Sequence, residues 1–148
     1  MSDPDCIAEP LTGSCLCGAV AITMRSAHRE VDICHCSMCQ QWTGSMYAGI
    51  EAPEFTITGE DHISVYQSSD WAERAFCKTC GSSLWYLFKP TGNRTFLAGM
   101  FDLPDDILIK HQIFVDDKPG WYDLAQKSPM KTSAEIIAEA QAAGFTFD

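Results

Sequence analysis

The sequence has few basic side chains and no long apolar run. Its 148 residues include 10 Lys and Arg against 20 Asp and Glu, which gives a formal net charge of -10. Because an acidic surface repels phosphate groups and no basic cluster offsets the balance, we expect no binding to nucleic acid. No stretch approaches the roughly 18 apolar residues that a membrane-spanning helix needs, so no membrane segment is expected either.

The first six residues, MSDPDC, contain neither a basic end nor an apolar run. We therefore expect no signal peptide and a cytoplasmic location. Because the cytoplasm is reducing, the eight cysteines are not expected to form disulfides. Their share of the chain is also below the roughly 8–10% that is typical of disulfide scaffolds. The thiols need another role, and their spacing indicates one.

The length fits one domain, without internal repeats or low-complexity segments. Residues 1–11 are polar, contain two prolines and are expected to form a flexible leader, and residues 12–148 a single domain. Short runs rich in β-branched and aromatic residues alternate with turn residues, which indicates strands. The expected strands cover residues 19–24, 55–58, 63–66, 83–88, 95–100 and 111–115. No run precedes a helix long enough for a parallel crossover, so the pattern favours antiparallel sheets.

One helix is predicted near the end of the chain, at about residues 132–143. Thr132-Ser133-Ala134-Glu135 fits a capping box, and Gly144 follows the apolar run as a stop signal. We expect this helix to pack on or beside the sheet. The fold class is therefore mainly β with a C-terminal helix.

Seven of the eight cysteines fall in three short groups, and Cys6 stands outside them. The groups are Cys15-Leu16-Cys17, Cys34-His35-Cys36-Ser37-Met38-Cys39 and Cys77-Lys78-Thr79-Cys80. Zinc explains such grouping, because it binds thiolates tetrahedrally and one turn can present two sulfurs at about 2.3 Å from the metal. Seven ligands make one closed site of four and one site of three with an open position.

The middle group alone can hold one ion, and the two outer pairs would share the other across about 60 intervening residues. Structural zinc sites are closed, whereas catalytic sites keep a position for water or substrate. We therefore expect two zinc ions per chain. The structural ligands would be Cys15, Cys17, Cys77 and Cys80, and the catalytic ligands Cys34, Cys36 and Cys39.

Three other interpretations of the cysteines stay open. A single zinc ribbon could form from Cys36, Cys39, Cys77 and Cys80, but it leaves three clustered thiols unexplained. An iron–sulfur cluster also takes thiolates, although the usual ferredoxin spacings are absent. The thiols could also pair as disulfides or be plain buried side chains.

Three ordered motifs carry a resemblance to a known family. They are Gly13-Ser14-Cys15-Leu16-Cys17-Gly18-Ala19-Val20, the middle cysteine group with Thr43-Gly44-Ser45, and Phe76-Cys77-Lys78-Thr79-Cys80-Gly81-Ser82. On these motifs the sequence resembles the glutathione-dependent formaldehyde-activating enzyme (GFA) family, which also includes centromere protein V. The resemblance runs from about Leu11 to Asp123 and takes in Asp102, Pro104 and the stretch from His111 to Trp121.

The resemblance implies a β-tent type fold, with several coiled antiparallel sheets around zinc. It also implies that the first and third motifs hold a structural zinc and the middle motif a catalytic zinc, which agrees with the ligand count. The activity implied is a carbon–sulfur lyase reaction that joins formaldehyde to glutathione, so the partner would be a small-molecule thiol such as glutathione. Gln40 and Gln41 stand where the family often has a basic residue. The family motifs do not identify which residues of this chain would bind glutathione.

An open three-thiolate zinc can bind a substrate thiolate by lowering the pKa of the thiol. His35 lies inside the middle group and is a candidate proton shuttle, although it could instead point away from the metal and bond to the backbone. No ligand spacing involves His28, His62 or His111, which are expected to be structural or on the surface. Six aromatic residues are candidates for a pocket or for packing. They are Trp42, Tyr47, Trp85, Tyr86, Trp121 and Tyr122.

Two acidic pairs, Asp105-Asp106 and Asp116-Asp117, lie beside prolines or Lys-Pro and indicate turns rather than acid/base dyads. Two functions follow from the sequence. The first is a zinc-dependent lyase that acts on a thiol adduct of a small aldehyde. The second is a non-enzymatic, zinc-stabilised module that binds a partner. The open three-thiolate site favours the enzyme.

Overall fold

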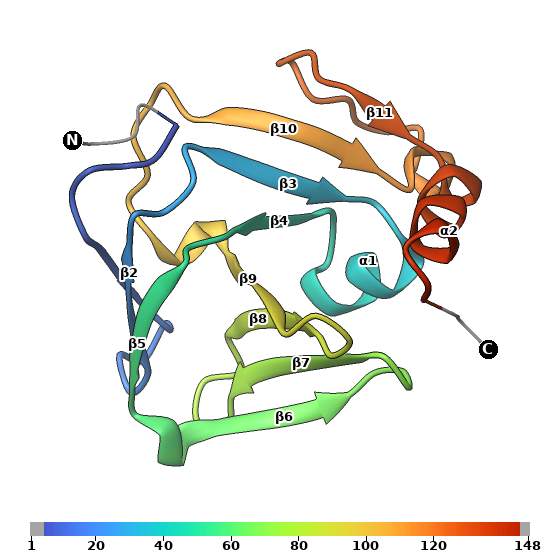
Figure 1. Ribbon diagram of the computed structural model, residues 1–148. Coiled ribbons are helices and arrows are strands. Elements are labelled where there is room, and N and C mark those ends of the chain that lie inside the picture. Colours follow the sequence, from blue (N-terminus) through green and yellow to red (C-terminus); the bar gives the residue numbers. More distant parts are fainter. Residues whose placement is uncertain (1–4, 146–148) are drawn as a thin grey trace. The chain divides into compact units, whose positions relative to one another are not determined.

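The computed structural model describes residues 5–145, and the chain divides into two compact units (Figure 1). The first unit contains Met1–Arg29 and Gly49–Ile107, and the second contains Glu30–Ala48 and Leu108–Asp148. Each unit is therefore built from two separate parts of the sequence. The single domain expected over residues 12–148 stays a prediction.

The first unit contains a three-stranded antiparallel sheet in the order β1-β2-β5. Its strands are β1 (Leu11–Ser14), β2 (Ala21–Arg25) and β5 (Glu54–Thr58). Along β2, Ile22 and Met24 are fully buried while their neighbours are less so, as the two-residue period of a strand requires. Gly13 is needed at its place in β1, because a Cβ there would lie 2.3 Å from the backbone oxygen of Met100.

A second antiparallel ladder in this unit runs in the order β9-β8-β7-β6. Its strands are β6 (Ile63–Gln67), β7 (Ala72–Cys77), β8 (Ser83–Phe88) and β9 (Asn93–Leu97). The end of β4 (Tyr47–Ile50) pairs with β9, and two short 3-10 helices are η1 (Glu60–His62) and η2 (Ala98–Met100).

An aromatic cluster forms the core of the first unit. The fully buried Phe96 ring makes edge contacts with Phe55 at 5.1 Å, Trp85 at 6.1 Å and Phe101 at 6.4 Å between ring centroids. Such pairs contribute about 0.5–1.5 kcal/mol each beyond the burial of apolar area. Because Phe55 belongs to β5 and Phe96 to β9, the cluster holds the two ladders of this unit together.

The second unit contains a parallel arrangement of three strands in the order β11-β10-β3. They are β3 (Glu30–Cys34), β10 (Leu108–Ile113) and β11 (Met130–Lys131), and β3 and β10 point the same way in Figure 1. The helices are α1 (Ser37–Thr43), α2 (Ser133–Ala142) and the 3-10 helix η3 (Val115–Asp117).

The mainly β fold with a C-terminal helix is confirmed, and α2 begins with the expected capping box between Thr132 and Glu135. The backbone N–H of Ser133 also donates to Asp116 at 2.8 Å, which joins α2 to η3. The antiparallel expectation holds for the first unit but not for β3, β10 and β11. The short helix α1 was not expected.

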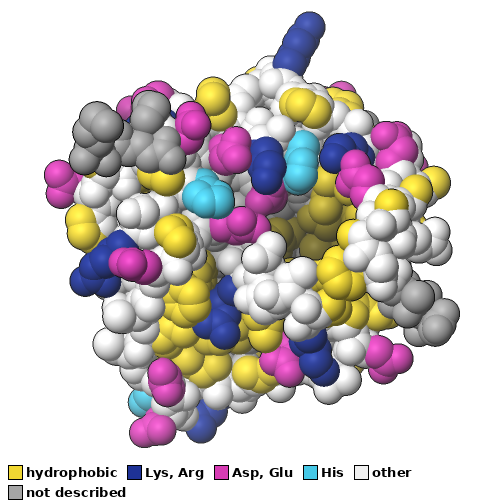
Figure 2. Space-filling view, viewed as in Figure 1, with side chains coloured by type: hydrophobic (Ala, Val, Ile, Leu, Met, Phe, Trp, Pro, Cys, Tyr) yellow, Lys and Arg dark blue, Asp and Glu magenta, His cyan; other side chains and the backbone are white. Residues whose placement is uncertain are grey.

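The expected flexible leader falls partly outside the described residues, at positions 1–4. Within the described part, Cys6 forms a β-bridge with His28, and the N–H of the buried Ile7 donates to Ala27 at 2.7 Å. No helix among the described residues is long and apolar enough to cross a membrane. On the face shown in Figure 2, the Lys and Arg side chains lie apart from one another and form no continuous basic area.

Candidate metal sites

Four cysteines of the first unit meet where two turns come together. Cys15 and Cys17 lie in the turn between β1 and β2. Cys77 is the last residue of β7, and Cys80 lies in the turn that leads to β8. The N–H of Leu16, in the first turn, donates to the Ser82 hydroxyl of the second at 3.0 Å.

The two turns follow the same plan, with a glycine directly after the second cysteine. Gly18 and Gly81 both have φ +82°, which an L side chain rarely adopts. Gly18 donates its N–H to the Cys15 carbonyl at 3.1 Å, and Gly81 to the Cys77 carbonyl at 2.7 Å. This conformation turns each chain segment tightly enough to present both of its sulfurs on one side.

The spacing of the sulfur atoms fits a tetrahedral metal. Sγ of Cys17 lies 3.6 Å from Sγ of Cys15 and 3.8 Å from Sγ of Cys77, and all four sulfurs lie within 4.8 Å of one another. With metal–sulfur bonds of about 2.3 Å, the edge of a tetrahedron is about 3.8 Å. A disulfide would need about 2.05 Å, and no cysteine of the described part forms one.

Hydrogen bonds at this site favour thiolates at some positions and oppose them at others. The side chain and backbone of Ser82 donate toward Cys80 and lower the pKa of its thiol to about 5. For Cys17, the backbone contact with Ala19 favours the thiolate, but burial and the other three thiols outweigh it and raise the pKa to about 11. Four close sulfurs cannot all be anionic without a cation, so this donor set fits a zinc ion.

Three cysteines of the second unit meet at the start of α1. Cys34 ends β3, Cys36 precedes α1 as its N-cap, and Cys39 lies buried in the first turn. The Cys36 sulfur caps the helix by accepting the Cys39 N–H at 3.4 Å. The three sulfurs lie within 4.8 Å of one another, and no fourth metal-binding side chain joins them among the described residues.

The neighbouring thiols of Cys36 and Cys39, together with burial, raise the pKa of the Cys34 thiol. As in the first site, thiols packed this closely need a cation before all of them ionise. The set could provide three of the four ligands of a tetrahedral zinc, which would leave one position for another molecule.

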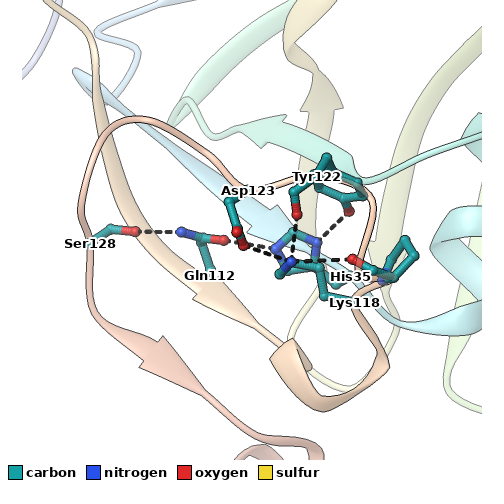
Figure 3. A network of polar contacts seen from close by, with 7 residues as sticks. His35, Gln112, Lys118, Tyr122, Asp123 and Ser128 are labelled. Carbon is teal, nitrogen blue, oxygen red and sulfur yellow. Dashed lines mark hydrogen bonds and ion pairs between the residues drawn. The ribbon is translucent and has the colours of Figure 1, made fainter.

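His35 lies between two of these cysteines but is not part of their cluster. The chain is extended in β3 and at Cys36, so neighbouring side chains point to opposite sides. The His35 ring is fully buried, with Nδ1 2.7 Å from the Tyr122 hydroxyl and Nε2 2.9 Å from Oε1 of Gln112 (Figure 3).

These contacts define the proton positions of the neutral imidazole. Gln112 donates from Nε2 to the Ser128 hydroxyl at 3.1 Å, so its Oε1 is the atom that faces His35. Because an amide oxygen only accepts, His35 carries its proton on Nε2, and Nδ1 accepts from the Tyr122 hydroxyl. Ser45 also bonds to Tyr122, while burial is the largest influence on this phenol and raises its pKa.

The backbone of His35 is held as well. Its N–H donates to the carbonyl of Ile113 at 3.0 Å, and its carbonyl accepts from the side chain of Gln40 at 2.6 Å. Lys118 supports the Tyr122 segment by donating to the Tyr122 carbonyl at 2.5 Å and pairing with Asp123 at 2.7 Å. His35 is therefore held by four hydrogen bonds, two at its ring nitrogens and two at its backbone N–H and carbonyl.

The other three histidines are not part of either cysteine cluster. His62 bonds to Thr79 at 3.1 Å beside the first cysteine site, and His111 pairs with Asp32 at 3.0 Å. His28 lies 3.8 Å from Glu51. Cys36 and Cys39 converge with Cys34, so they do not form the zinc-ribbon set with the β7–β8 turn.

Sequence reasoning did not single out Gln112, named Gln40 only as a departure from the family pattern, and named Tyr122 only as one of several aromatic residues. Gln112 is almost fully buried on a strand, and a buried amide needs a polar partner. Its position directly after His111 in a run of strand-forming residues was the one available signal, but it does not identify His35 as the partner.

Comparison with known proteins decides the family. A family model described as "Glutathione-dependent formaldehyde-activating enzyme" matches residues 10–117. The chain belongs to this family. The GFA match contains all seven clustered cysteines, whereas Tyr122 and Ser128 lie beyond it.

Two relatives are similar over most of their length. A Schizosaccharomyces pombe protein named as an uncharacterized lyase is 32% identical over 127 residues, covering 84% of this chain and 93% of the relative. A Halomonas elongata protein that carries the GFA family's name is 31% identical over 147 residues, covering 87% and 92%.

One solved structure shares the fold. It is the crystal structure of a Rhodobacter sphaeroides protein from a structural genomics programme, with a TM-score of 0.51 and 21% identity. The match covers 64% of this chain and 91% of that one.

Proposed function

We propose that this GFA-family chain is a zinc-dependent carbon–sulfur lyase that acts on the thiol adduct of a small aldehyde, with glutathione as the thiol. The observation that carries the proposal is the three-thiol set of Cys34, Cys36 and Cys39, to which no described side chain adds a fourth ligand. The family and the lyase name of a relative support a lyase reaction.

In this proposal Cys34, Cys36 and Cys39 hold a catalytic zinc. When bound, zinc would supply a positive charge that lowers the pKa of a substrate thiol and keeps it as the nucleophilic thiolate. A second, structural zinc would be held by the other site. Its ligands are Cys15, Cys17, Cys77 and Cys80.

The proposed reaction transfers a proton as well as forming a bond. A carbon–sulfur bond forms between thiol and aldehyde, the thiol loses its proton, and the carbonyl oxygen gains one. The lyase direction reverses these changes. His35 is fully buried, so we propose that it acts through Tyr122, a partly exposed residue whose hydroxyl lies 2.7 Å from Nδ1 of His35.

The proposed setting is the cytoplasm, where a reducing environment keeps the seven clustered thiols free to bind metal. A small thiol such as glutathione is abundant there. The expectation that the chain binds no nucleic acid rests on its net charge of -10.

The rate of exchange between free formaldehyde and its glutathione adduct tests this function, measured by NMR exchange spectroscopy against the uncatalysed background. The zinc-loaded protein should raise the rate, Cys36→Ser should lose the gain, and Tyr122→Phe should reduce it. Tyr66→Phe is the matched control, because Tyr66 is 63% exposed on β6. A wild-type rate equal to background would reject the lyase and favour the non-enzymatic binding module.

Binding of the thiol can be followed separately in cobalt-substituted protein. Titration with glutathione should change the cobalt–sulfur absorption of the wild type. The absorption of the Cys36→Ser variant should not change on the same titration. No change at millimolar glutathione would contradict a substrate thiolate at the three-cysteine site.

A further inference from the structure

A pocket of about 330 Å³ lies within the first unit and involves none of the cysteines. Its lining includes Phe55 of β5 and, at the start of β9, Asn93 and Arg94. His28 and Glu51 also line it. The volume is within the range of small-molecule sites, about 300–1,000 Å³.

Arg94 is unusual in this acidic chain. Its guanidinium lies between two aromatic rings, 4.9 Å from the centroid of Phe55 and 4.8 Å from that of Trp85. Among residues 5–145, no carboxylate lies within 4 Å of the Arg94 guanidinium, so Arg94 forms no ion pair there. Its buried Nε has no hydrogen-bond partner among these residues. Glu73 acts on it only from a greater distance.

An arginine in such a place is poorly compensated. Burial lowers the pKa of Arg94, which reflects the cost of taking its charge out of water, and the Glu73 charge only partly opposes this effect. Half-buried charges are normally paired, and a guanidinium presents a planar fork of donors that suits a carboxylate. The two rings hold the guanidinium plane in place, so less conformational entropy is lost when an anion binds.

The pocket lining also includes a residue of the opposite charge, Glu51. Oε2 of Glu51 lies 3.8 Å from Nδ1 of His28, which is at the long limit of an ion pair. Glu51 lines the pocket, and a carboxylate can accept from a ligand N–H or ammonium in addition to its existing contacts. A pocket lined by both an arginine and a glutamate favours a ligand that carries both charges.

We propose that this pocket binds the α-amino-acid end of a small molecule, with the ligand carboxylate on Arg94 and its ammonium on Glu51. Phe55 provides an apolar part of the lining. The ligand is a free amino acid or the amino-acid end of a small peptide. The inference stands on the first unit alone and does not depend on the lyase proposal or on either cysteine site.

Binding can be measured by isothermal titration of the purified, zinc-loaded protein. The probes are L-glutamate, glutarate, which lacks the ammonium, and S-methylglutathione, which has no free thiol for a metal. The wild type should bind glutamate or S-methylglutathione and discriminate against glutarate. Tighter binding of S-methylglutathione than of glutamate identifies a peptide ligand, and the reverse identifies a free amino acid.

Two substitutions test the two ends of the ligand. Arg94→Gln should weaken binding by about tenfold or more, as expected for the loss of charge-assisted hydrogen bonds, and Arg94→Lys should restore only part of it. Glu51→Gln should remove the preference for glutamate over glutarate. Arg25→Gln is the matched control, because Arg25 is exposed at the end of β2 in the same unit.

Three results would overturn the proposal. They are no binding of any probe to the wild type at millimolar concentration, equal binding by Arg94→Gln, and equal affinity for glutarate and glutamate in the wild type. Because S-methylglutathione cannot use its sulfur as a thiolate, its binding reports on this pocket even if the lyase assay fails. Circular dichroism of each variant identifies any loss that comes from unfolding.

Discussion

The two cysteine sites should differ in how much they stabilise the protein, and serine substitution can measure the difference. Cys77→Ser removes a fully buried ligand of the four-cysteine site. Cys36→Ser removes one ligand of the three-cysteine site. Serine is a favoured N-cap residue, so it can replace the Cys36 sulfur as the cap of α1 and leave the helix intact.

The magnitude follows from the length of chain that each bound ion closes. The first site joins Cys17 to Cys77, which are 60 residues apart, whereas the second spans only Cys34 to Cys39. Treated as cross-links, closures of these lengths contribute about 4 and about 2 kcal/mol of unfolding free energy. At about 2–4 °C per kcal/mol for a chain of this size, Cys77→Ser should lower the Tm by about 8–16 °C and Cys36→Ser by about 4–8 °C.

Metal content and thermal unfolding of the reduced proteins provide the assay. Mass spectrometry should find two zinc ions in the wild type and one in Cys36→Ser, which should keep the circular dichroism spectrum of the folded protein. Cys77→Ser should show the larger loss of Tm. A wild type with a single zinc ion, or a Cys36→Ser variant as unstable as Cys77→Ser, would refute the division into a structural and a catalytic site.

Four further substitutions test the surrounding structure in three predictions, each by urea unfolding. Gln112→Leu should cost about 1–3 kcal/mol, because it leaves the buried imidazole N–H without an acceptor, and an unchanged midpoint would contradict this. Gly81→Ala should lower the free energy of unfolding by about 1–2 kcal/mol from its positive φ alone, because a Cβ there meets only open space. Gly59→Ala should lower it clearly more, because its Cβ would lie 1.9 Å from the Ala19 oxygen. Equal losses in the two variants would contradict the clash. Burial lowers the pKa of His111 from 6.5, so protonation favours the unfolded chain and stability should fall as the pH drops below about 6.5. His111→Gln should flatten the dependence on pH, and an equally steep loss in the variant would assign it to other groups.

Ligand spacing carried most of what the sequence revealed about the metal sites. The four-plus-three grouping of the cysteines is the grouping that the structure brings together. Spacing could do this because the members of each group are close in sequence and a turn must place them side by side. The pairing of the two outer groups across 60 residues followed only from the count of ligands, since no local pattern encodes it.

The missed helix has a local cause. Helix starts are recognised by an oxygen-bearing N-cap such as Ser, Thr, Asp or Asn, and α1 uses the sulfur of Cys36 instead. Its seven residues are also too few to show a clear apolar period. By contrast, α2 was found at nearly its observed bounds, because Thr132 and Glu135 form an ordinary capping box.

β3 was not among the expected strands, and its parallel pairing with β10 was missed for a topological reason. Parallel neighbours need a long crossover, which is usually a helix, and no candidate strand was followed by one. Between β3 and β10, however, the chain runs through α1 and then forms most of the first unit, residues 49–107. A crossover made of a whole folded unit leaves no helical signal next to either strand, so antiparallel pairing was the wrong expectation for β3 and β10.

The alternation of side chains at Cys34-His35-Cys36 links the metal site to the core of the second unit. The two cysteines present their sulfurs to the cluster, and the intervening imidazole enters the interior, where Gln112 and Tyr122 bond to it. His35 is fully buried and held at both nitrogens, so besides the proton transfer proposed through Tyr122 it has a positioning role. The position of the His35 ring holds the turn that carries both sulfurs. The arrangement of these sulfurs therefore depends on the contacts of Gln112 in β10 and of Tyr122, which lies beyond the residues matched by the family model. Gln112→Leu should therefore weaken zinc binding at the three-cysteine site as well as stability, although Gln112 is not itself in the cysteine cluster.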